Sequence, residues 1–122
     1  MAEHRPHPAN VPGDFYVEDG CCTMCEVPFA EAPGLFGVTQ DPKGYPHCYV
    51  QRQPGSPAEL DQMVSAIRCA ELECIRYRGT DRRIQLRLVE VGQGAICDGL
   101  PQELQQEANR QEAERQPWWR FW

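Results

Sequence analysis

The clearest hydrophobic pattern lies in the middle of the chain and predicts an amphipathic helix. Ser56 is followed by Pro57 and then by Glu59, which is the arrangement of an N-terminal capping box. The apolar side chains behind it recur at helical spacing, at Leu60, Met63, Val64 and Ile67. We therefore predict a helix from Pro57 to about Cys69.

Shorter apolar runs on either side of this helix predict strands. Aromatic and β-branched residues gather at 14–19, 35–38, 45–51 and 74–78, and turn-forming residues lie between the runs. Two prolines between the first two runs leave room for only one or two helical turns, around Phe29–Ala32. The predicted order is strand, short helix, two strands, helix and strand.

The C-terminal third is predicted to be helical. Thr80 can cap a helix that ends at Gly92. Residues 102–116 are rich in Gln and Glu and predict another helix, and all three tryptophans of the chain lie in the last five residues. Because exposed aromatic side chains are costly in water, we expect this tail to bind a partner, to self-associate or to fold back on the domain.

Composition divides the chain into three parts. Residues 1–13 hold three prolines and no apolar stretch, so they predict a disordered lead-in without a secretory signal. Residues 14–98 predict one compact domain, and 99–122 form the helical tail. No apolar run is long enough for a transmembrane helix.

The charge distribution argues against a nucleic-acid partner. The chain has 12 basic and 18 acidic residues and a net charge of −6, so it lacks the basic footprint of a generic nucleic-acid binder. Between positions 14 and 42 the acidic residues are unopposed by Lys or Arg, at Asp14, Glu18, Asp19, Glu26, Glu31 and Asp41. This segment is either an ordinary solvated surface or a face that docks a basic partner.

The seven cysteines carry the strongest chemical signal. Their number is odd, so they cannot all pair within the chain. Cys22 and Cys25 form a C-x₂-C pair, a spacing at which two thiolates converge on zinc or on an iron–sulfur cluster. A thioredoxin-like redox pair needs a long following helix, which Pro28 and Pro33 prevent. We therefore interpret the pair as metal ligands.

The arrangement of strands, helix and cysteines resembles that of the single-cluster bacterial ferredoxins over residues 14–78. The matching features are a strand with an acidic end, the C-x₂-C pair, a Pro-to-Phe segment and a helix that leads through a cysteine into a strand: Val17-Glu18, Cys22 and Cys25, 32–36, 66–69 and 74–77. The resemblance implies an α+β, ferredoxin-like βαββαβ core, here with a trailing helix and a helical, Trp-rich tail.

The resemblance implies that three cysteines bind the cluster, namely Cys22, Cys25 and Cys69. Pro28 stands where the family has its third cysteine, which is a departure from the pattern. Cys48 is the first candidate for the fourth ligand. The next candidates for the fourth ligand are Cys74, which can equally be a buried core thiol, and then Cys21. His47, the neighbour of Cys48, is a candidate in place of Cys48. Cys97 is interpreted as a core or free thiol, and His4 and His7 as spectators.

The implied function is that of a small cytoplasmic electron carrier, not an enzyme. It holds a 4Fe–4S cluster, or 3Fe–4S if only three thiolates ligate, and passes single electrons to a redox partner with a basic docking face. The alternative is a ferredoxin-like interaction module, zinc-stabilised or metal-free, that serves as an adaptor, inhibitor or immunity-type partner.

Overall fold

The computed structural model describes residues 4–21, 26–40, 42–70 and 73–114 of this α+β chain. Most predicted elements are present, in the predicted order and within a few residues of the predicted bounds. The elements are β1 (Phe15–Val17), α1 (Val27–Glu31), β2 (Phe36–Gln40), β3 (Pro46–Val50), α2 (Pro57–Cys69), β4 (Ile75–Tyr77), α3 (Arg82–Glu90) and α4 (Gln102–Glu114), and a 3₁₀ helix that was not predicted, η1 (Gly94–Ile96), lies between α3 and α4. None of these helices is long and apolar enough to cross a bilayer.

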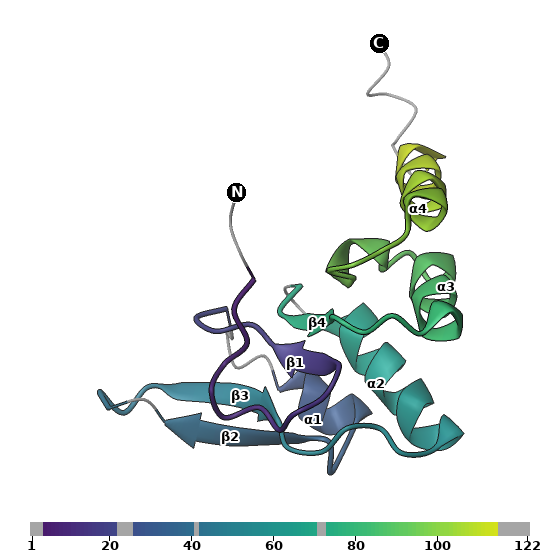
Figure 1. The fold of residues 1–122 in the computed structure, drawn as a ribbon. Coiled ribbons are helices and arrows are strands. Elements are labelled where there is room, and N and C mark those ends of the chain that lie inside the picture. Colours follow the sequence, from purple (N-terminus) through teal and green to yellow (C-terminus); the bar gives the residue numbers. More distant parts are fainter. Residues whose placement is uncertain (1–3, 22–25, 41, 71–72, 115–122) are drawn as a thin grey trace.

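The strands form two small antiparallel sheets. β1 pairs with β4, with Val17 opposite Ile75, and β2 pairs with β3 as a hairpin, with Phe36 opposite Val50. β1 and β3 contact each other without forming a common ladder. Figure 1 shows α3, η1 and α4 at the end of the molecule away from the β2–β3 hairpin. The predicted βαββαβ order is therefore present, but its four strands are divided between two sheets.

Residues 5–11 lie along both sheets, although the sequence predicts a disordered lead-in over 1–13. The amide of His7 donates to the carbonyl of Val17 (2.9 Å), and that of Asp19 donates to Arg5 (2.7 Å). Further along, the amide of Val11 donates to Val50 of β3 (2.9 Å). The prolines do not prevent this path, since a proline lacks only its own donor and the neighbouring residues supply the bonds.

Asn10 joins the two sheets through its side-chain amide. Its Oδ1 accepts from the backbone amides of Val17 in β1 (3.1 Å) and Val50 in β3 (2.8 Å). Its Nδ2 donates to the carbonyls of Val17 (2.9 Å) and His7 (2.8 Å). We call this set of four hydrogen bonds the Asn10 bridge. It occupies the place where a direct β1–β3 ladder would otherwise lie.

The helix starts follow the predicted capping chemistry with one difference. Ser56 Oγ accepts from the amide of Glu59 (3.1 Å), which confirms the cap of α2. The carboxylate of Glu59 accepts from Gly55 (2.9 Å), one residue before the position that a full capping box uses. α3 begins one residue later than predicted, because Asp81 rather than Thr80 is its N-cap. Both residue types can cap, so local sequence does not separate them.

A buried polar network attaches the C-terminal helices to the β1–β4 sheet. Arg76 of β4 donates from Nε to Asp98 (2.7 Å) and from Nη2 to the carbonyl of Ala95 (3.1 Å). The hydroxyl of Tyr16 in β1 donates to the same Asp98 carboxylate. Burial, together with this bond to a carboxylate, raises the pKa of Tyr16. The network fixes the segment that follows η1 against the edge of β4.

Candidate functional site

The structure describes the positions of two of the four predicted cluster ligands and does not test their role. Cys22 and Cys25 lie outside the described residues. Cys48 is buried in the core on β3, whereas Cys69, the last residue of α2, is exposed. The iron–sulfur centre and the electron-carrier function therefore remain predictions.

Two alternative ligands are bonded to each other. Cys21 and Cys74 form a disulfide with their Cα atoms 5.5 Å apart. The β1–β4 pairing brings these segments together, since the amide of Glu18 donates to the carbonyl of Cys74 (2.8 Å). Cysteine binds metals as a thiolate, so in the disulfide form neither residue serves as the fourth ligand, and Cys74 is not a free core thiol. Structural disulfides are most common in oxidising compartments, and the cytoplasmic location stays a prediction.

A groove lies between the N-terminal ends of α2 and α3. Its volume is about 690 Å³, which is within the range of ligand pockets. Phe15 and Tyr77 form its floor, with ring centroids 4.8 Å apart. The apolar walls come from α2, α3 and the two prolines at the start of α2, namely Leu60, Ile84, Pro54 and Pro57. We call this the α2–α3 groove.

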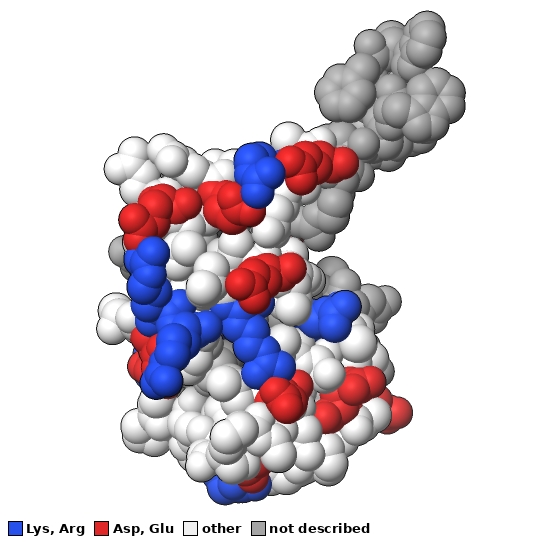
Figure 2. Space-filling view, turned by 90° about the vertical axis from the view of Figure 1, so that its right-hand side faces the viewer, with Lys and Arg blue, Asp and Glu red and all other residues white. Residues whose placement is uncertain are grey.

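Arginines line the outer edge of the α2–α3 groove. The side chain of Arg83 is 95% exposed, and its nearest carboxylate oxygen, on Asp81, is 3.9 Å away. Arg87 forms an ion pair with Asp61 (2.5 Å), which links α3 to α2. Figure 2 shows basic side chains in a band across this side of the molecule, with acidic side chains on both sides of it. The groove therefore combines an apolar floor with a cationic edge.

Three acidic side chains of the segment predicted as a possible docking face have neighbours within the protein. Glu18 pairs with His4 (2.6 Å), and Asp14 lines the α2–α3 groove. Asp19 lies beside two histidines. Asp41 lies outside the described residues. Docking of a basic partner on this segment remains a prediction.

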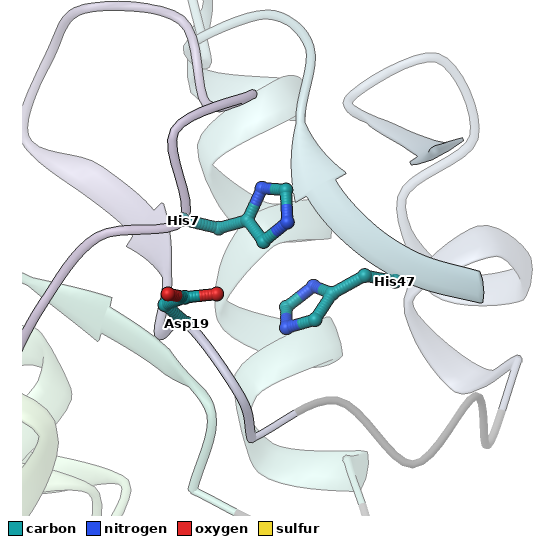
Figure 3. Close-up of side chains that lie close together, drawn as sticks. All are labelled: His7, Asp19 and His47. Carbon is teal, nitrogen blue, oxygen red and sulfur yellow. The ribbon is translucent and has the colours of Figure 1, made fainter. Parts of the chain in front are cut away.

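A second group of polar side chains gathers where the N-terminal segment crosses the sheets. His7 precedes β1, Asp19 follows it and His47 lies on β3 (Figure 3), and one ligand atom from each lies within 4.8 Å of the others. The two imidazole rings stack with centroids 4.1 Å apart. Burial, with a contribution from His47, lowers the pKa of His7, while Asp19 acts in the opposite direction.

Backbone contacts orient both imidazole rings. His47 Nδ1 lies 2.7 Å from the carbonyl of Cys48, and its Nε2 accepts from the amide of Gly20 (3.0 Å). His7 Nδ1 accepts from the amide of Ala9 (3.1 Å). Sequence reasoning treated His7 as a spectator, because nothing local relates it to a histidine 40 positions away. Only the path of the N-terminal segment brings the two together.

Comparisons with known proteins do not place the chain in a family. No family model, no curated protein and no solved structure matches it. The resemblance to single-cluster ferredoxins accordingly remains a prediction from the sequence pattern.

Proposed function

We propose that this chain is a binding module whose α2–α3 groove takes aromatic peptide segments. The observation that carries the proposal is the combination, in one groove, of apolar walls with an exposed arginine, Arg83. An aromatic ring buries a large apolar area, and its face attracts a guanidinium group. Arg83, with its loose contact to Asp81, is available for such a partner.

The walls of the groove support binding of a peptide without a large rearrangement. Pro54 and Pro57 restrict the backbone that leads into α2, and the Arg87–Asp61 ion pair links α3 to α2 across the groove. A preformed site loses less conformational entropy when it binds than a site that must first be ordered. This function corresponds to the interaction module that the sequence left as an alternative.

The chain itself contains a suitable probe. Residues 115–122 carry three tryptophans and one phenylalanine. A fluorophore-labelled peptide of these residues should bind the full chain saturably, as measured by fluorescence anisotropy. Arg83→Ala should weaken binding about three- to fivefold, the range of one exposed cation–π contact. Ile84→Asp should weaken it at least about tenfold, because it places a charge on the apolar wall.

Matched controls separate the groove from non-specific contacts of an aromatic peptide. Arg68→Ala removes another exposed arginine, at the far end of α2, and should leave the affinity unchanged. A peptide with its four aromatic residues changed to serine should not bind. Equal losses in Arg68→Ala and Arg83→Ala, or no loss in Ile84→Asp, would show that the peptide binds elsewhere. A chain ending at Glu114 that binds the peptide more tightly than the full chain would show that the native tail competes for the groove.

A further inference from the structure

The three clustered side chains His7, Asp19 and His47 come from separate parts of the chain. His7 belongs to the N-terminal segment, Asp19 follows β1 and His47 is on β3. Their side chains point toward a common centre (Figure 3). Two imidazoles and one carboxylate within 4.8 Å of one another are a ligand set, and we propose that they bind one divalent transition-metal ion, with zinc the best match.

The chemistry of the donors selects the class of metal. Imidazole nitrogen suits zinc, copper, nickel and iron, whereas calcium and magnesium prefer sites made of oxygen ligands alone. A tetrahedral zinc ion with bonds of about 2.0–2.1 Å holds its ligand atoms roughly 3.3 Å apart. The ligand atoms now lie within 4.8 Å of one another, so coordination requires them to approach by up to about 1.5 Å. The two imidazole rings are stacked, so at least one ring must also turn to direct its lone pair at the metal, and the exposed Asp19 side chain is free of the core to follow.

The surroundings of His47 resemble the outer shell of a metal-bound histidine. With a proton on Nδ1 donated to the carbonyl of Cys48, the lone pair lies on Nε2. That lone pair now accepts from the amide of Gly20, so a metal ion takes the place of one N–H donor. Coordination through either nitrogen of His7 similarly ends its contact with the amide of Ala9, because the metal or a proton then occupies Nδ1.

A metal ion at this position would join the N-terminal segment to both sheets. The backbone of residues 5–11 already follows β1 and β3 through hydrogen bonds. Coordination adds a link between His7 in the N-terminal segment and His47 on β3. The third ligand, Asp19, is two residues before the disulfide-bonded Cys21 in the sequence. Three protein ligands leave a fourth tetrahedral position for water or for a donor from a ligand.

The test uses the full chain, freed of metal with a chelator and titrated with Zn²⁺ by calorimetry. Cys22→Ser and Cys25→Ser are introduced together, so that the C-x₂-C pair does not bind zinc by itself. We expect one equivalent of zinc to bind and to raise the melting temperature. Titration with Co²⁺ should give a spectrum without thiolate-to-metal charge transfer, because the proposed ligands contain no sulfur.

Variants of single ligands then decide the assignment. His7→Ala and His47→Ala should each lower the zinc affinity at least about 100-fold, and Asp19→Asn about tenfold. His4→Ala is the matched control, since His4 is a histidine of the same segment that pairs with Glu18 instead, and it should leave the affinity unchanged. Absence of saturable binding, equal losses in His4→Ala and His7→Ala, or a thiolate signal in the Co²⁺ spectrum would overturn the proposal.

Discussion

Asn10→Ala should lower the free energy of unfolding by about 3–5 kcal/mol. The substitution removes the Asn10 bridge and leaves the amides of Val17 and Val50 without their acceptor. Both valines are 0% exposed, so water does not reach these amides without a change in the fold. An unsatisfied buried donor costs about 1–3 kcal/mol, and the lost links to two carbonyls add to that cost.

Chemical denaturation measures this effect directly. The urea midpoint of Asn10→Ala should fall with little change in slope if the native state keeps its compactness. Asn109→Ala is the matched control, because Asn109 lies on the exposed surface of α4, where its side-chain oxygen accepts from Gln105 (3.0 Å). Its effect should stay within about 0.5 kcal/mol. Similar midpoints for the two variants would mean that the bridge contributes little to stability.

Removing the Cys21–Cys74 disulfide should cost about 4 kcal/mol. The two cysteines are 53 residues apart, and closing a loop of that length restricts the unfolded chain substantially. We expect the Cys21→Ser/Cys74→Ser double variant to melt roughly 15 °C lower than the unchanged chain. Replacing both residues avoids leaving one reactive thiol behind.

A reducing agent provides the complementary measurement. It should lower the melting temperature of the unchanged chain and leave that of the double variant where it is. Cys69→Ser, at an exposed free cysteine, should behave like the unchanged chain in both conditions. If the reductant affects the unchanged chain and the double variant equally, the disulfide is not the source of the stability. Mass spectrometry under non-reducing conditions would count the linked thiols independently.

Local sequence signals predicted the secondary structure well. The start of α2 matches the prediction because Ser56 and Pro57 are adjacent in the sequence and both act on the first turn of the helix. The strands were placed within two or three residues for the same reason, since aromatic and β-branched residues and their flanking turns are contiguous. Capping, periodicity and turn chemistry are all short-range effects.

Features that depend on distant pairing were missed. The proline-rich composition before Gly13 indicated disorder, yet Asn10 finds its partners in β1 and β3. The pairing of Cys21 with Cys74 follows from the β1–β4 register, which the spacing of cysteines does not reveal. The predicted βαββαβ order did not show that the four strands divide between two sheets, or that the Asn10 side chain bonds to both β1 and β3. Local composition does not encode which segments meet.

The disulfide also determines what a break in the backbone would do. Lys43 is the only lysine of the sequence and lies exposed in the turn between β2 and β3, inside the stretch that the disulfide spans. A lysine-specific protease that cuts there once leaves two fragments joined through sulfur. Under non-reducing electrophoresis we expect a single species, and after reduction two, with residues 1–43 and 44–122. Cleavage in the β2–β3 turn would thus change the connectivity of the chain without separating its parts.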